Sequence, residues 1–329
     1  MSFRAFVVDM QDEDFSAGVQ SLDEGQLPAG DVTIDVQWSS VNYKDGLATL
    51  PKGRVVTQYP MVPGIDLAGR VRESADDRFS AGQEVLITGY DLGVAHFGGF
   101  AEVARVPGDW IVPLPGGLSA EEAMALGTAG FTAGLSVEAL QAHGVTPESG
   151  PVLVTGATGG VGSTAVAILA RLGYTVAAST GKADEHDYLR ALGASEILSR
   201  EEVSEESRRP LERERWAGAI DPVGGATTAY ILRTLKRDGV NAVSGLTGGA
   251  GVNTTVMPFI LRGASLVGVE SVYCPMPRRS EIWRRLAGDW KPDALLDAIA
   301  VRTDLDGVAA AAAAILRGAV RGRTLVRLG

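Results

Sequence analysis

A glycine-rich stretch near the middle of the chain constrains the fold more than any other feature. Between Val152 and Thr180 the sequence reads "VLVTGATGGVGSTAVAILARLGYTVAAST", which places Gly156, Gly159 and Gly162 between a β-branched run and a long apolar helical pattern. Glycines at a strand-to-helix turn let backbone N–H groups approach a pyrophosphate at the positive end of the helix. The spacing predicts a dinucleotide-binding turn, although it is less strict than G-x-G-x-x-G and also suits a turn without a ligand.

The residues around this stretch alternate between strand and helix patterns, which indicates a doubly wound parallel α/β sheet of the Rossmann type. The expected strands are Pro151–Thr155, Tyr174–Ser179, Glu196–Leu198, Ala217–Asp221, Gly239–Gly245 and Ser265–Glu270. The chain before Ser119 instead shows short strands broken by turns, and a last strand follows an alanine-rich helix near the C-terminus. We therefore expect a mostly β domain of residues 1–120, completed by residues 286–329, and a Rossmann domain of residues 121–285.

Composition narrows the class of protein. A chain of 329 residues is long enough for two domains, and a net charge of −10 disfavours non-specific binding to nucleic acid or to an anionic membrane. The single cysteine, Cys274, excludes an intramolecular disulfide and a cysteine-based structural zinc site. Acidic residues stand where a signal peptide needs an apolar run, and we find no apolar run of the roughly 18–20 residues that a membrane span needs. We expect a soluble, cytoplasmic protein whose partners are small molecules, with no nucleic acid and no membrane.

The end of the second expected strand of the sheet distinguishes between the two nicotinamide dinucleotides. NAD-binding folds carry an acidic residue there that accepts hydrogen bonds from the ribose hydroxyls, whereas this chain reads Ser179, Thr180, Gly181 and Lys182. Hydroxyls and a lysine favour the 2′-phosphate of NADPH. Arg200, after the third strand, would add a second cation, unless both cations are solvated surface charges. The predicted cofactor site comprises Thr158, Gly159, Gly160, Val161, Ser179, Thr180, Gly181, Lys182, Arg200, and, after the fifth and sixth strands, Leu246 and Ser271.

Six motifs together resemble a known family. They are "SSVNYKDGLA", "PMVPGIDLAG", "GTAGFTAGLSV", "VTGATGGVGSTAV", "AIDPVGG" and "TTVMPFILRG". They are similar to the quinone oxidoreductase branch of the medium-chain dehydrogenase/reductase superfamily, and within it most similar to the acrylyl-CoA reductase group. The resemblance runs through nearly the whole chain. It implies a GroES-like N-terminal domain, a Rossmann domain, NADPH as cofactor and a homodimer.

The same resemblance predicts an enzyme without zinc. Zinc alcohol dehydrogenases of this superfamily carry a Cys and a His-Glu pair at positions that here read Asn42-Tyr43 and Ile65-Asp66. A catalytic zinc needs about three nitrogen, sulfur or oxygen ligands at one site, and the three histidines of this chain show no ligand spacing. Without a Lewis acid, hydride delivery to an already electrophilic carbon is favoured over alcohol oxidation.

An α,β-unsaturated thioester provides such a carbon, so we predict an oxidoreductase acting on a CH–CH group that reduces acrylyl-CoA to propanoyl-CoA. Family resemblance puts the nicotinamide beside Asn42 and Tyr43. We predict both as catalytic residues, with Tyr43 a hydrogen-bonding group for nicotinamide or substrate, although they could instead cap a helix and pack without chemistry. Resemblance also puts Arg323 at the cofactor, with a structural ion pair as the alternative. Asp45 is expected to orient the turn, and Asp221 to be structural.

A CoA ester carries several phosphates, so it needs local cations in a chain of net negative charge. We expect one of two clusters to bind its nucleotide end. The first comprises Lys44, Lys52 and Arg54, and the second Arg278, Arg279, Arg284 and Arg285. An NADPH:quinone oxidoreductase needs neither cluster and remains the alternative activity, followed by a non-catalytic NADPH-binding protein.

Overall fold

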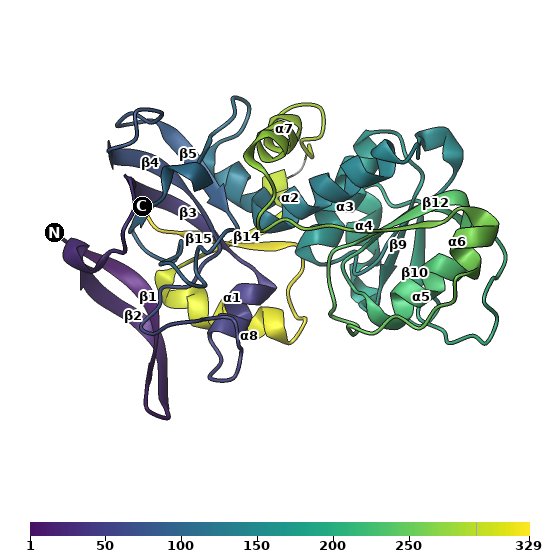
Figure 1. Ribbon diagram of the computed structural model, residues 1–329, viewed down its shortest axis with the longest axis horizontal. Helices are drawn as coiled ribbons and strands as arrows, with labels where there is room; N and C mark the ends of the chain where they lie inside the picture. Colours follow the sequence, from purple (N-terminus) through teal and green to yellow (C-terminus); the bar gives the residue numbers. More distant parts are fainter. Residues whose placement is uncertain (294) are drawn as a thin grey trace. The chain divides into compact units, whose positions relative to one another are not determined.

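The computed structural model describes residues 1–293 and 295–329, and the chain divides into two compact units (Figure 1). Unit 1 comprises Met1–Thr128, Val272–Ala287 and Leu295–Gly329, and unit 2 comprises Ala129–Ser271 and Gly288–Ala294.

Unit 1 thus includes residues 121–128 and 272–285, which the sequence analysis assigned to the Rossmann domain. Hydrogen bonds join both segments to the rest of unit 1: the Thr128 N–H donates to Asp66, the Val272 carbonyl accepts from the Tyr90 backbone N–H, and Arg279 donates to the Thr88 carbonyl.

Unit 2 contains a six-stranded sheet in which every pair of neighbouring strands is parallel. Its strands are β8 (Val152–Val154), β9 (Val176–Thr180), β10 (Glu196–Ser199), β11 (Trp216–Asp221), β12 (Leu235–Val243) and β13 (Ser265–Gly268). Their order in space is β10-β9-β8-β11-β12-β13. The strand order therefore reverses direction between β8 and β11. A doubly wound sheet binds a dinucleotide at this point. The prediction of a Rossmann sheet is confirmed, and each expected strand overlaps an observed one.

Helices pack along this sheet and cover its apolar residues (Figure 1). They are α3 (Gly160–Arg171), α4 (His186–Ala191), α5 (Gly225–Thr234) and α6 (Met257–Arg262). The core of unit 2 contains Leu153 and Ala219 from the strands, Ile231 from α5 and the fully buried Trp216. The β-branched and small residues of the strands fit this environment because both faces of a parallel sheet are covered.

Unit 1 is mostly β. Its larger sheet contains β3 (Val32–Val41), β4 (Asp66–Ser74), β5 (Glu84–Thr88), β6 (Val103–Val106), β7 (Val112–Pro113), β14 (Ala300–Asp304) and β15 (Arg323–Arg327). These strands lie in the order β14-β15-β3-β4-β5-β7, and β6 also pairs with β3. The C-terminal strand β15 runs antiparallel to β3, so the end of the chain returns to the N-terminal part, and the expected mostly β unit is confirmed.

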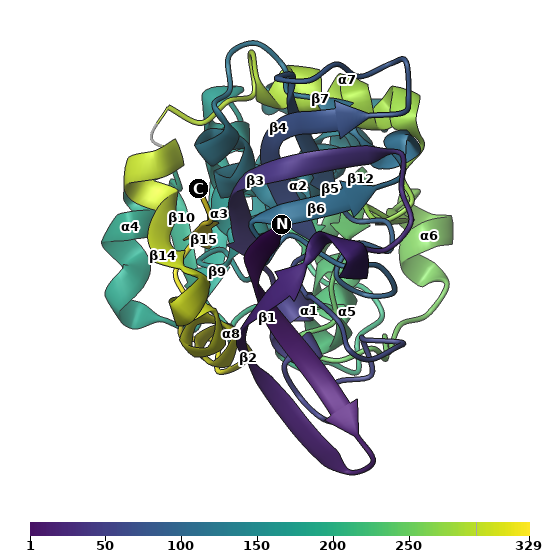
Figure 2. The same cartoon turned by 90° about the vertical axis from the view of Figure 1, so that its left-hand side faces the viewer.

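Unit 1 also contains a two-stranded hairpin and the helices α1, α7 and α8. The hairpin consists of β1 (Ser2–Gln11) and β2 (Asp14–Asp23), and its tip projects away from the larger sheet in Figure 2. The helices are α1 (Tyr43–Ala48), α7 (Met276–Leu286) and α8 (Val308–Leu316), and α1 packs against α8. Their contact is close, because a Cβ on Gly46 would lie 2.9 Å from Cγ of Leu316.

The longest helix, α2 (Ala120–Ala142), is a buried helix with a break in it. In the described part of the chain it is the one helix long and apolar enough to cross a membrane, but 89% of its apolar window is buried inside the protein. It is therefore a core helix. Its backbone leaves helical geometry at Gly127, where φ is 53° and ψ is −157°, a conformation that glycine adopts without a Cβ clash.

Candidate functional site

The glycine turn joins β8 to α3 in unit 2. Gly156 has a φ of 53°, and the carbonyl of Gly156 accepts a hydrogen bond from the Gly159 N–H at 2.9 Å. A Cβ on Gly162 would lie 2.4 Å from that carbonyl oxygen and 2.6 Å from Cα of Ala157. Side chains are thus excluded where the helix starts, and no acidic residue occupies the first turn of α3. The turn fits a pyrophosphate, which backbone N–H groups at a helix N-terminus bind.

Two cations lie at the adjacent edge of the sheet, after β9 and β10. A Cβ on Gly181 would lie 2.9 Å from a guanidinium nitrogen of Arg200, so this arginine lies over the end of β9. Burial lowers the pKa of Lys182; the neighbouring Arg200 lowers it further, while Glu185 opposes the shift. Arg200 therefore lies close enough to Lys182 to influence its charge, next to Gly181. Two neighbouring cations are suited to bind a phosphate.

Thr158 and Thr180 connect the glycine turn to this cationic edge. Their hydroxyl oxygens lie 3.4 Å apart and both side chains are buried, and the Thr180 hydroxyl also accepts from the backbone N–H of Lys182 at 3.1 Å. Ser179 differs, because its hydroxyl donates to the Ser199 carbonyl within the sheet at 3.2 Å. Thr180 is therefore better available to a ligand than Ser179.

The remaining residues predicted for unit 2 follow the carboxyl ends of other strands. Leu246 is 66% exposed in the loop after β12, and Ser271 follows β13. Asp221, at the end of β11, is fully buried and accepts hydrogen bonds from Thr155, Thr228 and two backbone N–H groups. It holds the loop after β11 in place, as a structural residue does.

In unit 1, Asn42 and Tyr43 start helix α1 directly after β3. Asn42 is 7% exposed, and both polar atoms of its side-chain amide are hydrogen-bonded. The amide nitrogen donates to Asp66 at 2.8 Å, and the amide oxygen accepts from Arg323 at 3.0 Å. Tyr43 is 45% exposed, and its hydroxyl has no hydrogen-bond partner among the described residues. Of the two, Tyr43 is the residue whose side chain is free to contact a ligand.

Behind this turn lies a buried ion pair between Asp66 and Arg323. The Asp66 carboxylate is fully buried and accepts from the Ser40 hydroxyl at 2.7 Å, from Asn42, and from the backbone and hydroxyl of Thr128. Arg323 is 3% exposed and donates to Ser40, Asn42 and, at 3.4 Å, Asp66. Burial lowers the pKa of Arg323, and the Asp66 and Asp45 carboxylates oppose the shift. Arg323 therefore has the structural ion pair that was its alternative.

The break in α2 lies against this ion pair. A Cβ on Gly127 would lie 2.5 Å from a carboxylate oxygen of Asp66 and 2.6 Å from a guanidinium nitrogen of Arg323. The left-handed geometry of Gly127 also frees the Thr128 N–H from the helix, so that it donates to Asp66 at 3.0 Å. The sequence analysis gave no role to Asp66, Ser40 or Thr128, although all three stand in the motifs that carry the family resemblance.

A second buried carboxylate, Asp45, is hydrogen-bonded to the backbone of the turn. It accepts from the Asn42 backbone N–H at 2.8 Å and from the N–H groups of Gly64 and Ile65 at 3.2 and 3.0 Å. Burial and, less strongly, the charge of Asp66 raise the pKa of Asp45 to about 7, against the lowering effect of its hydrogen bonds to Asn42 and Ile65. Asp45 orients the turn, as expected, and does so with a carboxyl that titrates near neutral pH.

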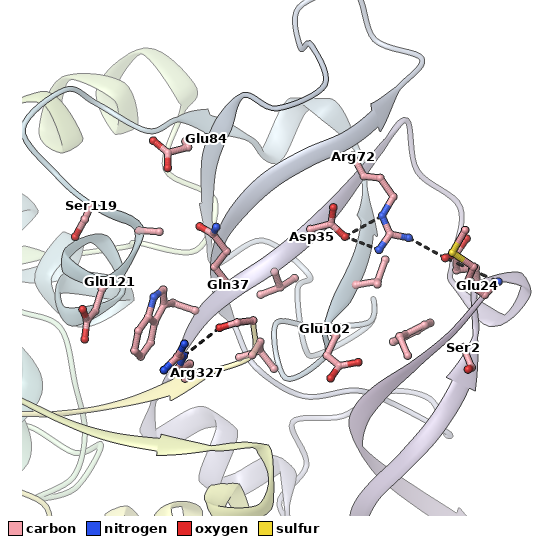
Figure 3. A pocket seen from close by; sticks show the side chains of 18 residues that line it. Ser2, Glu24, Asp35, Gln37, Arg72, Glu84, Glu102, Ser119, Glu121 and Arg327 are labelled. Atoms are coloured by element: carbon pink, nitrogen blue, oxygen red, sulfur yellow. Dashed lines mark hydrogen bonds and ion pairs between the residues drawn. The ribbon is translucent and has the colours of Figure 1, made fainter.

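A cavity of about 790 Å³ elsewhere in unit 1 holds none of the predicted residues (Figure 3). Both chain termini line it, and several of its charged side chains are paired with one another or with neighbouring residues. Figure 3 shows Arg72 between Asp35 and Glu24, to which it is hydrogen-bonded. We therefore locate the candidate chemistry in unit 1 at the Asn42–Tyr43 turn and not in this cavity.

Comparison with known proteins accounts for both units. Residues 28–116 match the family model "Alcohol dehydrogenase GroES-like domain" and residues 160–288 match "Zinc-binding dehydrogenase". The acrylyl-CoA reductase AcuI of Ruegeria pomeroyi is 51% identical over 328 residues, with 98% of each chain covered. The chain belongs to the acrylyl-CoA reductase group of the medium-chain dehydrogenase/reductase superfamily.

Solved structures of this group have the same fold. The yhdH oxidoreductase from Salmonella enterica, in complex with NADP, is 53% identical and superposes with a TM-score of 0.96 over 99% of this chain and 100% of that one. The Bacillus subtilis protein yhfP, with NAD bound, is 49% identical, with a TM-score of 0.97 and full coverage of both chains.

The residues present do not fit the zinc ion that the second family model names. Within residues 1–293 and 295–329, no three His, Cys, Asp or Glu side chains converge as metal ligands. The oxygens of Asp66 are already engaged by Asn42, Ser40, Thr128 and Arg323. We derive no step of the reaction through zinc.

Proposed function

We propose that this protein is an NADPH-dependent reductase that converts acrylyl-CoA into propanoyl-CoA. The observation that carries the proposal is the full-length likeness to an acrylyl-CoA reductase, at an identity that extends through both units. NADPH supplies the hydride when it is bound. The protein must then bind both molecules, orient the thioester, and stabilise the negative charge that develops on the thioester oxygen.

The preference for NADPH is supported by the chemistry at the carboxyl end of β9. The chain has no acidic residue from Ser179 to Lys182, and Lys182 and Arg200 share the site beside Thr180. Lysine and arginine attract a phosphate, whereas an acidic residue would select the free ribose hydroxyls. The glycine turn at Gly156 and the N-terminus of α3 would hold the pyrophosphate. We assign the 2′-phosphate to Lys182 and Arg200.

We propose Tyr43 as the residue of unit 1 that hydrogen-bonds the nicotinamide or the thioester. The exposure of its side chain supports this role, and a phenol hydroxyl both donates and accepts hydrogen bonds. We assign Asn42 a positioning role, because its amide is bonded to Asp66 and Arg323. Through those bonds the buried ion pair fixes the start of α1.

A second copy of the chain is the proposed partner in solution. β13 is an edge strand of its sheet, and an unpaired edge is a template for pairing with another strand. Exposed apolar side chains surround it: Val256, Met257, Ile260, Leu261 and Leu266. We propose a homodimer through this edge, located in the cytoplasm. Light scattering of the Ile260→Glu variant tests this interface, and an unchanged dimer mass would exclude it.

Product identification tests the activity. Purified protein is incubated with NADPH and either acrylyl-CoA or a simple quinone at matched concentrations, and the products are resolved by mass spectrometry. We expect propanoyl-CoA, and we expect Tyr43→Phe to lower kcat more than it raises KM for NADPH. Faster turnover of the quinone would replace the proposal by the quinone oxidoreductase alternative, and NADPH binding without turnover would indicate a non-catalytic protein.

A further inference from the structure

The structure distinguishes between the two cation clusters that could bind the nucleotide end of a CoA ester. The arginines of α7 are engaged within the protein. Arg284 and Arg285 both pair with Glu281, at 2.7 and 2.9 Å, and these two cations lower the pKa of Glu281 to about 2. Arg279 is fully buried and bonded to Thr88 and Val272. A ligand phosphate would have to compete with these partners.

The other cluster consists of Lys44, Lys52 and Arg54, and we call it the turn cluster. Lys44 lies in α1, and Lys52 and Arg54 are exposed in the loop that follows. None of the three makes a hydrogen bond or an ion pair with any residue in the described part of the chain. Cations without internal partners bind a phosphate without first breaking another contact.

The loop that carries Lys52 and Arg54 is held against α1. A Cβ on Gly53 would lie 1.8 Å from the Leu47 carbonyl oxygen, so only glycine permits this approach, and the Gly53 N–H donates to Leu50 at 3.0 Å. The two flanking cations are therefore fixed beside the helix that begins at the proposed ligand contact Tyr43.

The surroundings of the turn cluster suit an anionic ligand with an apolar part. Asp45 and Asp66 are buried, and no acidic residue lies between them in the sequence, although the chain has 40 acidic residues. Tyr43 and Leu50 add exposed apolar surface, at 45% and 42% exposure. A CoA thioester combines phosphates with an apolar acyl and pantetheine arm, so its chemistry matches this surface.

A second set of cations, Arg208 and Arg209, lies in unit 2, and their guanidinium groups have no partner among residues 1–293 and 295–329. They line a cavity of about 560 Å³ together with Glu205 and Glu206. The two carboxylates oppose the binding of a phosphate there. Arg208 and Arg209 therefore provide a matched control: the same kind of cation, also unpaired, at a site with opposing charges.

We propose that the turn cluster binds the phosphates of the CoA moiety. The proposal rests on the proposed function, because it assumes a CoA thioester as substrate. It assigns Lys44, Lys52 and Arg54 to substrate affinity and not to the chemical step.

The test compares two thioesters, acrylyl-CoA and acrylyl-pantetheine, which lacks the nucleotide and its phosphates. The variants are Lys52→Glu/Arg54→Glu and Lys44→Glu, with Arg208→Glu/Arg209→Glu as the control. We expect KM for acrylyl-CoA to rise about tenfold in the Lys52→Glu/Arg54→Glu variant, since two exposed attractions become repulsions. The advantage of acrylyl-CoA over acrylyl-pantetheine in KM should disappear. The control variant should keep that advantage.

Each outcome separates this proposal from the activity itself. The turn cluster is not the site if the unmodified protein reduces both thioesters and the turn-cluster variants keep its KM for acrylyl-CoA. The same conclusion follows if only the Arg208→Glu/Arg209→Glu variant loses affinity for acrylyl-CoA. If the unmodified protein reduces neither thioester, the proposed function fails first. Added NaCl gives a second readout that needs no variant: KM of the unmodified protein should rise for acrylyl-CoA more than for acrylyl-pantetheine, and equal responses would overturn the proposal.

Discussion

The buried ion pair between Asp66 and Arg323 allows a prediction with a worked magnitude. Arg323→Met keeps a long apolar stem and removes the guanidinium, which leaves the fully buried Asp66 carboxylate without its cation. It also removes donors to Ser40 and Asn42. Breaking one side of a buried ion pair costs about 3–5 kcal/mol, a large part of the roughly 5–15 kcal/mol by which a folded domain is stable. We expect a loss of that size in the free energy of unfolding.

Urea unfolding followed by circular dichroism measures this loss, and the double variant Asp66→Asn/Arg323→Met provides the control. The double variant removes both charges, so its destabilisation should be smaller than the sum of the two single variants by about 1–3 kcal/mol. Because the pair also holds Asn42 at the start of α1, kcat with acrylyl-CoA should fall in Arg323→Met. A cost below about 1 kcal/mol, or single effects that simply add, would refute the reasoning.

Three further predictions concern the cofactor site and the turn. The double variant Lys182→Glu/Arg200→Glu should raise KM for NADPH about 100-fold, since two charge-assisted contacts are lost. KM for NADH should stay nearly unchanged. An equal rise for both coenzymes would contradict the assignment of the 2′-phosphate. Gly162→Ala puts a Cβ 2.4 Å from the Gly156 carbonyl oxygen, so NADPH titration should show weaker binding and the melting temperature should fall, whereas normal values would mean that the turn adapts. The pKa of Asp45 is about 7 in the folded protein, against 3.8 for an ordinary Asp in the unfolded chain. Between those pH values the folded state binds more protons than the unfolded state. As the pH rises through this range, the free energy of unfolding, relative to that of Asp45→Asn, should therefore fall by about 1.4 kcal/mol per pH unit. A difference independent of pH between 5 and 7 would show that Asp45 is ionised throughout.

Local signals explain why the Rossmann unit was predictable. Most strands of the parallel sheet are short runs rich in β-branched and small residues, and a helix follows β8, β9, β11 and β12. The glycine turn depends largely on neighbouring residues, because the Gly156 carbonyl accepts from the Gly159 N–H and lies close to Gly162. The cations after β9 were identifiable because the end of a parallel strand is where a dinucleotide fold binds its ligand.

The buried ion pair could not be predicted in the same way. Asp66 and Arg323 are separated by 257 positions in the chain. They meet because β3 pairs with both β15 and β4. The break in α2 could not be predicted from the sequence either. Gly127 stands within a helical pattern, and its close neighbour, the Asp66 carboxylate, is far away in the sequence. The β1–β2 hairpin was missed because Phe6, Val7 and Val8 are all buried in succession, so the strand lacks the regular alternation that identifies a half-buried strand.

The central claim is that a phosphate-binding pair beside the glycine turn commits this reductase to NADPH. The most direct measurement is kcat/KM for the reduction of acrylyl-CoA with NADPH and with NADH, in parallel and at one ionic strength. We predict a preference for NADPH of about 100-fold, equivalent to roughly 2.7 kcal/mol. Equal values for the two coenzymes would contradict the account, because Lys182 and Arg200 would then contribute nothing to cofactor choice.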